Sequence, residues 1–224
     1  MSRVFCIPGI VFLLCALVLS FLVSISLPYL TALDIVRTTF DGSDGVKGVR
    51  EVRFGIWSHC EYDAQDDART CAASGVAYHV TVQGASNEVT IGNSWTRGLA
   101  IHPVATAATF VAFLLSFSTH TTVTLVASLV SFLAALITLI AFAVDIALFA
   151  YVKNKMGDVE GVGANTRTGA GFWMTFVSFI LLLLAGCTVC FGRRRDRMST
   201  ATTTSTYDTE KRGFMSRFRR RPRV

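Results

Sequence analysis

The segment Phe54-Gly55-Ile56-Trp57-Ser58-His59-Cys60, which Cys71 follows after ten intervening residues, lies in a polar stretch that long apolar runs flank on both sides. Two cysteines at this separation, beside a glycine and an aromatic residue, are what a small disulfide-bonded fold needs. Disulfides persist in oxidising compartments. The segment therefore predicts a small exoplasmic fold, provided that the flanking runs place it outside the cytosol.

The flanking runs make the bilayer the first solvent to consider. Of 224 residues, 52% are hydrophobic and 16% are charged, which is too apolar for an ordinary soluble domain. Residues 4–27 contain no charge, and a helix of that length crosses a hydrocarbon core of about 30 Å. A cleavable signal peptide is the alternative, because Arg3 precedes the run, but the apolar part exceeds the roughly 7 to 15 residues usual for one. We expect a retained first span.

Three further spans follow. The next long apolar interval carries one formal charge, Asp145, and a polar dip at 116–122 divides it into predicted spans at 103–119 and 123–151. The fourth predicted span is 171–191, which a run of arginines ends. The predicted fold class is an α-helical integral membrane protein, a bundle of four transmembrane helices.

The orientation follows from the basic residues beside the spans, since Lys and Arg are retained on the cytoplasmic side. Residues 192–224 carry eleven Lys or Arg against three Asp or Glu, a net charge of +8, whereas residues 28–102 carry six against nine, a net charge of −3. Both termini are therefore predicted to be cytoplasmic. The loops 28–102 and 152–170 are then exoplasmic.

The first loop is predicted to be β-rich and disulfide-bonded. Cys60 and Cys71 are the only cysteine pair that this topology places in the oxidising compartment, and closing their loop should contribute about 3 kcal/mol. Residues 76–82 alternate as a half-buried strand does, and residues 49–57 and 88–91 are weaker strand candidates. We expect a small antiparallel sheet on top of the helices, without a bound metal.

One polar pair is predicted at the outer ends of the second and third spans. His102 opens the second span and Asp145 lies near the outer end of the third. Because histidine changes charge near neutral pH, the two residues are a candidate pair whose protonation responds to ambient pH. Alternatively, Asp145 caps its helix or meets Lys153 or Lys155, and His102 only marks the start of the span.

The remaining candidate sites lie at the cytoplasmic end. Cys187 and Cys190 approach the inner membrane face and are candidates for S-palmitoylation, with simple packing as the alternative. Residues 192–224 are predicted to be a basic, disordered tail that binds anionic inner-leaflet lipids rather than nucleic acid. The arginines expected to contact lipid are Arg193, Arg194, Arg195, Arg217, Arg219, Arg220 and Arg221.

Four short motifs carry a family resemblance. Gly55-Ile56-Trp57 with Cys60 and Cys71 is similar to the Gly-Leu-Trp-Cys-Cys pattern of claudin-like four-span proteins. Three motifs follow at membrane entries: Ile101-His102-Pro103-Val104-Ala105, Asp145-Ile146-Ala147-Leu148-Phe149 and Gly169-Ala170-Gly171-Phe172-Trp173-Met174-Thr175. Together, over roughly residues 1–192, the chain resembles the fungal PalI family of ambient-pH response regulators, which is related to the Sur-type eisosome proteins. It departs from the pattern at Ser58-His59 and in its short tail.

The resemblance implies a function in binding rather than catalysis. A PalI-like protein is expected to be an accessory plasma-membrane component of ambient-pH signalling, which helps a seven-span pH-sensing receptor to reach its place or assemble. The alternatives are a Sur-like organiser of membrane domains and cell wall, or claudin-like adhesion, and self-association is possible in each. The sequence contains no nucleophile–base pair, phosphate loop or metal-ligand cluster, so we predict neither an enzyme nor a cofactor.

Overall fold

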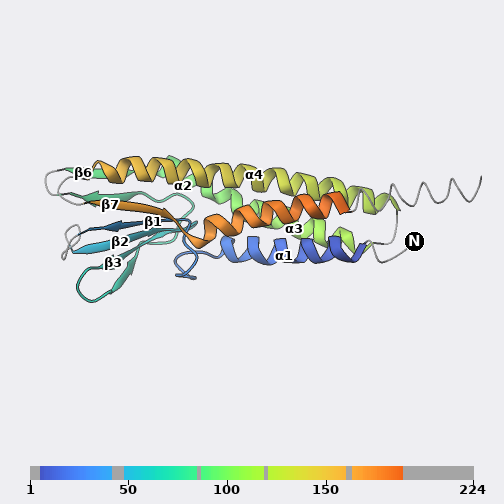
Figure 1. Cartoon of the computed structure of the whole chain (residues 1–224), viewed down its shortest axis with the longest axis horizontal. Helices are drawn as coiled ribbons and strands as arrows, with labels where there is room; N and C mark the ends of the chain where they lie inside the picture. Colours follow the sequence, from blue (N-terminus) through green and yellow to red (C-terminus); the bar gives the residue numbers. More distant parts are fainter. Residues whose placement is uncertain (1–5, 42–47, 85–86, 119–120, 160–162, 189–224) are drawn as a thin grey trace, which may run out of the picture.

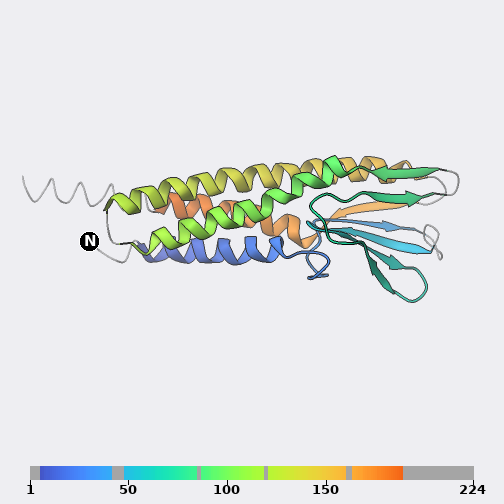
Figure 2. The ribbon, with the colours of Figure 1, turned by 180° about the vertical axis from the view of Figure 1, so that it is seen from behind.

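The computed structural model of the chain describes residues 6–41, 48–84, 87–118, 121–159 and 163–188. They form a helical bundle with a β-structure at one end, and the strands run along the same long axis as the helices (Figure 1). Seen from behind, the β-structure still continues directly from the ends of the helices (Figure 2). The two parts therefore form one elongated body.

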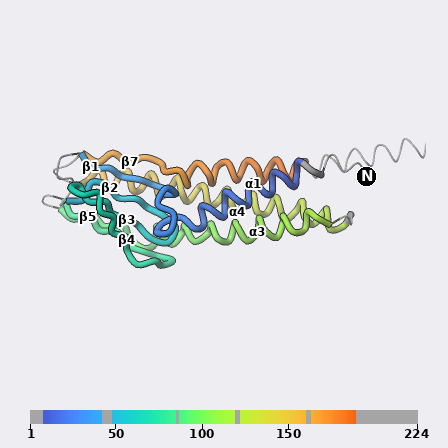
Figure 3. Tube along the Cα trace, turned by 90° about the horizontal axis from the view of Figure 1, so that it is seen from below, coloured from blue at the N-terminus to red at the C-terminus, as the bar shows by residue number. Residues whose placement is uncertain are grey.

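The bundle consists of long apolar helices. They are α1 (Cys6–Ser24), α3 (Ile101–Ser116), α4 (Thr121–Gly157) and the helix Ala170–Thr188, and α3 is preceded by the short α2 (Asn93–Arg97) and the 3₁₀ turn Gly98–Ala100. Three helical segments, Asn93–Ser116, Thr122–Gly157 and Ala170–Thr188, are long and apolar enough to cross a membrane, and Pro8–Ser24 is a shorter apolar helix. Viewed from below, α1 lies beside α3, and α4 runs the length of the molecule (Figure 3).

The helix α4 is the largest difference from the predicted spans. It continues to Gly157, past the predicted end at Tyr151. Its 37 residues give a length of about 55 Å, which exceeds a hydrocarbon core of about 30 Å. The surplus is used for packing, because Leu148, Val152 and Met156 are buried on one helix face against the β-structure. Lys153 and Lys155 indicated the edge of the membrane, but they do not end the helix.

The β-structure contains two antiparallel sheets. Their strands are β1 (Val36–Phe40), β2 (Val49–Phe54), β3 (His59–Asp63), β4 (Arg69–Cys71), β5 (Val80–Gln83), β6 (Glu88–Ile91) and β7 (Ala164–Thr168). The larger sheet has the order β4-β3-β2-β1-β7, and β5 pairs with β6 in the smaller one. Because β7 follows α4 in the chain, both loops contribute to the larger sheet.

Two strand expectations need correction. The strand predicted at 76–82 begins only at Val80, and Val76 lies outside it and is exposed. The strand β7 was not predicted, because Ala164-Asn165-Thr166-Arg167-Thr168 contains no alternating large apolar residues. It is a strand because its backbone pairs with β1 along the full length of both strands. The predicted strand at 88–91 is β6.

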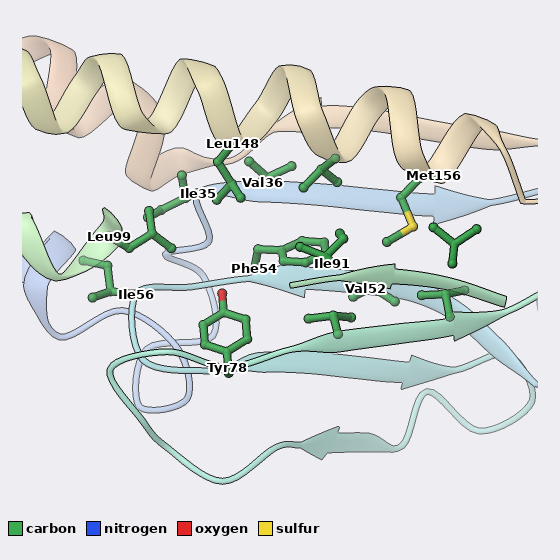
Figure 4. Packing of buried hydrophobic residues seen from close by; sticks show 14 of the residues in the cluster. Ile35, Val36, Val52, Phe54, Ile56, Tyr78, Ile91, Leu99, Leu148 and Met156 are labelled. Atoms are coloured by element: carbon green, nitrogen blue, oxygen red, sulfur yellow. The ribbon is translucent and has the colours of Figure 1, made fainter. Parts of the chain in front are cut away.

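The core lies where the two sheets meet α4. Val36, Val52 and Phe54 point from the larger sheet toward Leu148 and Met156 of α4, as Figure 4 shows. Within the bundle, a second cluster consists mainly of alanines with two leucines. Its fully buried members are Leu13, Ala16, Ala112, Ala134, Ala135, Leu182 and Ala185. Small residues allow helices to approach closely in lipid, so the bundle and the β-structure are held by different kinds of packing.

The role of the α4 extension can be tested at Met156. The substitution Met156→Ala should destabilise the fold by about 2–5 kcal/mol, because it leaves a cavity between α4 and the sheet. Lys153→Ala, on the exposed side of the same helix turn, is the matched control and should change stability by less than about 0.5 kcal/mol. Thermal unfolding of the purified protein in detergent, followed by near-ultraviolet circular dichroism, measures both. Equal melting temperatures for the two variants would contradict the packing role.

Candidate functional site

The segment Gly55-Ile56-Trp57 contacts the end of α1 and the residues just after it. We call this contact between α1 and the sheet the joint. The indole Nε1 of Trp57 donates a hydrogen bond to the carbonyl of Ser24, the last residue of α1, at 2.7 Å. The backbone N–H of Ile56 donates to the hydroxyl of Ser26 at 3.0 Å. Helix ends leave carbonyl groups without a partner inside the helix. The Trp57 indole supplies a donor to one of these carbonyls, so the sheet is fastened directly to the end of the first helix.

Gly55 is required in the joint because nothing larger fits. A Cβ atom at this position would lie 3.0 Å from the backbone nitrogen of Leu27 and 3.1 Å from its Cα. The carbonyl of Gly55 accepts a hydrogen bond from the hydroxyl of Tyr78 at 2.7 Å. Burial raises the pKa of the Tyr78 phenol. Tyr78 therefore remains a protonated donor at physiological pH.

The joint is continuous with the disulfide. Cys60 and Cys71 lie directly opposite each other on β3 and β4, and they form a disulfide, as the sequence predicted. The bond fastens the short edge strand β4 to the sheet. Next to it, the His59 ring stacks on Tyr78 with 5.5 Å between centroids, and its Nε2 lies 3.7 Å from Glu61 Oε1.

The predicted polar pair is formed within the bundle. His102 Nε2 lies 3.0 Å from Asp145 Oδ1, and the two residues are 4% and 0% exposed. Asp145 is twelve residues from the end of α4, so it does not cap the helix. Its ion-pair partner among the described residues is His102, not Lys153 or Lys155. The other carboxylate oxygen, Oδ2, is buried without a hydrogen-bond partner in the described part of the chain.

A short chain of hydroxyl groups connects this pair to the joint. Thr106 Oγ1 lies 3.0 Å from the carbonyl oxygen of His102 and 2.7 Å from Ser24 Oγ. The same Ser24 accepts the Trp57 indole hydrogen bond on its carbonyl. The pair, α1 and the joint are thus neighbours through one serine and one threonine. Sequence reasoning missed this connection, because Ser24 and Thr106 carry no motif of their own.

The side of the larger sheet that faces away from the core carries arginines on four strands; we call it the open sheet face. Arg37 pairs in register with Arg53 on β2 and with Arg167 on β7. Arg69 of β4 pairs with Tyr62 of β3, one row further along. Like charges that lie directly opposite each other destabilise a sheet. This arrangement therefore needs either counter-charges within the chain or an anionic partner.

Two of these arginines have counter-charges and two do not. Arg37 Nη2 lies 2.9 Å from Asp34 Oδ1, and this contact raises the pKa of Arg37 despite its partial burial. Glu51 Oε1 lies 3.1 Å from Arg37 Nε and 2.6 Å from Arg53 Nε. Arg69 and Arg167 are exposed, and no described carboxylate lies within 4.0 Å of either. The open sheet face retains unpaired positive charge at both edges.

The other predicted site residues fall at the far end of the chain. Cys187 is half-buried near the end of the helix Ala170–Thr188. Cys190 and the arginines from Arg193 to Arg221 lie outside the described residues, so lipidation and lipid binding there stay predictions. Among the residues that the structure describes, no group of three or more His, Cys, Asp or Glu is arranged to hold a metal ion.

Comparison with known sequences assigns the chain to a family. The sequence model of the SUR7/PalI family matches residues 5–185. The chain belongs to the SUR7/PalI family. The resemblance carried by the four motifs is thereby confirmed, and the chain is a multi-pass membrane protein. No curated protein matches it.

The matched range places every described feature of the joint inside the SUR7/PalI region. It contains the joint, the disulfide, the His102–Asp145 pair and all seven strands, and it ends before the basic tail. The arginines of the open sheet face were not predicted, because they are scattered over four strands and meet only through sheet register. Tyr78 was predicted as one buried residue of an alternating strand, not as the donor to Gly55.

The joint makes a specific prediction for this SUR7/PalI protein. Gly55→Ala should lower stability by about 1–3 kcal/mol, because the added methyl group overlaps Leu27. Gly157→Ala is the matched control, since a Cβ atom there meets nothing within 4 Å. Thermal unfolding and the amount of protein at the cell surface measure both variants. The joint would be less tightly packed than described if Gly55→Ala were delivered and melted like the wild type.

Proposed function

We propose that this SUR7/PalI protein is an accessory plasma-membrane component of ambient-pH signalling, which helps to localise or assemble a seven-span pH-sensing receptor by binding it. In this proposal the chain crosses the membrane four times, both termini are cytoplasmic and the β-structure is exoplasmic. The observation that carries the proposal is the open sheet face, a rigid, charged surface that both loops build.

The direction of the open sheet face favours a partner in the same membrane. The strands of the larger sheet run parallel to the helices (Figure 1). The faces of the sheet therefore point sideways, along the plane of the membrane, and not outward from its surface. A protein that stands beside this one meets the face directly, whereas a protein on an opposite cell meets the strand ends and loops. This favours binding to a membrane receptor over claudin-like adhesion.

The charge of the face indicates the chemistry of the partner. Arg69 and Arg167 present guanidinium groups at the two edges, and Arg53 stacks on the Tyr62 ring, 4.3 Å from its centroid. Arginine and tyrosine are enriched where protein surfaces bind one another. Complementary charge sets specificity and the rate of encounter. An exoplasmic segment with two or more acidic residues suits this face.

Charge reversal at the two edges tests the proposal. In cells, proximity labelling by the wild-type protein should recover the pH-sensing receptor, and the double variant Arg69→Glu/Arg167→Glu should reduce that labelling about tenfold or more. Lys153→Glu is the matched control, because it makes the same change at an exposed site away from the face. Labelling is compared at acidic and alkaline pH, at equal surface amounts of each variant.

The possible outcomes distinguish an error in the proposed binding surface from an error in the proposed function. If the wild type labels the receptor and the double variant labels it equally well, the open sheet face is not the binding surface. If the wild type never labels a receptor of the pH pathway, the proposed function is wrong.

The second candidate is a Sur-like organiser of membrane domains and cell wall, because the matching family includes SUR7 as well as PalI. Deletion of the gene distinguishes the two. Loss of growth at alkaline pH with a mislocalised receptor supports the signalling role. Loss of static cortical patches with a defective cell wall supports the organising role.

The His102–Asp145 pair supplies a candidate pH-responsive element for the signalling role. The described parts of α1, α3 and the helix Ala170–Thr188 carry no charged side chain beside the pair other than His102 itself. On α4 the nearest charges after Asp145 are Lys153 and Lys155, two turns or more further along, and Asp34 at the outer end of the bundle is bonded to Arg37. Arg97, at the end of α2 and five residues before His102, is exposed. His102 and Asp145 are thus the buried titratable groups of this site.

His102→Gln tests the pair, because glutamine can form a hydrogen bond to Asp145 but does not titrate. The pH at which the signalling output is half-maximal should move by about 0.5 units or more. His79→Gln is the matched control, since His79 is exposed and lies outside the pair. The midpoint is read from a pH-responsive reporter in cells. An unchanged midpoint in His102→Gln would show that the pair is structural.

A further inference from the structure

Among the described residues, the large apolar side chains that are exposed outside α1, α3, α4 and the helix Ala170–Thr188 lie where the bundle meets the strands. They are Tyr29, Leu30, Val76 and Trp95, with exposed fractions of 71%, 36%, 54% and 39%. None of them belongs to a strand, and no strand of the β-structure exposes a large apolar side chain among the described residues. We call these four residues the junction collar. They come from three separate segments of the chain.

Hydrogen bonds place the first two segments at the joint. Leu27, two residues before Tyr29, packs against Gly55, and the backbone N–H of Tyr29 donates to the carbonyl of Ser26 at 3.2 Å. Gly75, next to Val76, donates its N–H to the carbonyl of Trp57 at 2.8 Å. Both segments therefore lie beside the end of α1.

The third segment, α2 with Trp95, is held at the junction by contacts with α4 and with Tyr78. Trp95 stacks on Tyr151 of α4, with 4.1 Å between ring centroids. Thr96, the next residue, accepts the backbone N–H of Tyr78 on its hydroxyl at 3.1 Å. Figure 1 shows α2 and the loop after α1 on opposite sides of the molecule, both where the bundle meets the strands. The collar thus has members on more than one side.

The loop that carries Tyr29 and Leu30 projects from the body and is held in place. Figures 1 and 2 both show this loop, between α1 and β1, standing out at the junction. Arg53 Nη1 donates to the carbonyl of Thr31 at 3.1 Å, and the N–H of Leu33 donates to the carbonyl of Leu30 at 3.1 Å. The loop contains no charged residue before Asp34. The loop thus presents an exposed tyrosine and leucine with no charged residue between them and the end of α1.

The collar continues the surface that the helices expose to lipid. On α1 the exposed residues Val11, Leu14, Val18 and Phe21 repeat at helical spacing toward the joint. On α4 the exposed large apolar residues end at Ile146, and beyond it Leu148, Val152 and Met156 are buried. The lipid-facing surface therefore stops just below the collar. Tyrosine and tryptophan are enriched at this boundary in membrane proteins, where one end of the ring is apolar and the other is hydrated.

We propose that the junction collar inserts into the interfacial region of the bilayer on the side of the β-structure. Its ligand is the layer of lipid headgroups and upper acyl chains. Because Arg53 and Gly55 connect the Tyr29 loop to β2, insertion fixes the height and tilt of the sheet above the membrane. The open sheet face is then presented at a set distance from the lipid. This inference does not depend on the pH-signalling role and holds equally for a Sur-like organiser.

Depth-dependent quenching tests the insertion in the full chain. Cys6, Cys15, Cys187 and Cys190 are replaced by alanine, while Cys60 and Cys71 keep their disulfide, and single cysteines carry the fluorophore NBD. The labelled variants are Tyr29→Cys, Leu30→Cys and Val76→Cys. The matched control is Glu88→Cys, an exposed position at the far end of β6. Each protein is reconstituted in phosphatidylcholine liposomes.

The expected result is opposite for collar and control. Lipid spin-labelled near the headgroup should quench NBD at positions 29, 30 and 76 at least threefold more than at position 88. Iodide in the water should quench position 88 at least threefold more than the collar. Formation of the Cys60–Cys71 disulfide, assayed by maleimide labelling after denaturation, shows that each variant is folded. Because three collar positions are labelled, the test still works if one of the variants does not fold.

Iodide quenching of the collar equal to that of position 88 would overturn the proposal. Quenching by iodide in liposomes combined with protection in cell membranes would also overturn it, since a protein and not lipid would then cover the collar. Neither outcome touches the proximity-labelling test of the proposed function.

Discussion

The close approach of Gly55 to Leu27 is the constraint on which the rest of the structure depends. A chain that leaves a bilayer must satisfy the backbone groups at the end of its helix, and it must do so next to lipid. Here the β2–β3 turn folds back onto the end of α1, where the Trp57 indole donates to the Ser24 carbonyl and the Ile56 N–H donates to the Ser26 hydroxyl just beyond the helix. Only glycine permits that approach. The sheet is therefore an extension of the first helix rather than a domain on a linker.

The helix α4 also holds the sheet against the bundle, on the other side of the molecule. Its first part packs in the bundle and its last part forms one wall of the β-structure core, with Leu148 and Met156 buried there. The chain then returns through β7 into the larger sheet beside β1. Two independent connections, the joint and α4, thus hold the sheet against the bundle. Rigid presentation of a surface is what a protein that acts by binding requires, because less freedom is lost when the partner binds.

The sequence indicated the features that depend on composition and local pattern. Long uncharged runs revealed the helices, and the topology they imply singled out Cys60 and Cys71. The features that it did not reveal depend on tertiary pairing. The residues of β7 are polar and become a strand only because β1 offers its backbone. The helix α4 passes the charged residues Lys153 and Lys155, since the sheet buries its other face. The open sheet face exists only in the register that brings Arg37, Arg53 and Arg167 together.

The His102–Asp145 pair lies close to the joint and is linked to it by hydrogen bonds. Asp145 is buried, its Oδ1 lies 3.0 Å from His102 Nε2, and its Oδ2 has no hydrogen-bond partner among the described residues. A buried, unpaired carboxylate is costly, so the contact with His102 stabilises Asp145 inside the bundle. The backbone carbonyl of His102 accepts a hydrogen bond from the Thr106 hydroxyl, which lies 2.7 Å from Ser24 Oγ, and the Ser24 carbonyl accepts the Trp57 indole. The helix turn that carries His102 is therefore linked to the joint through one threonine and one serine.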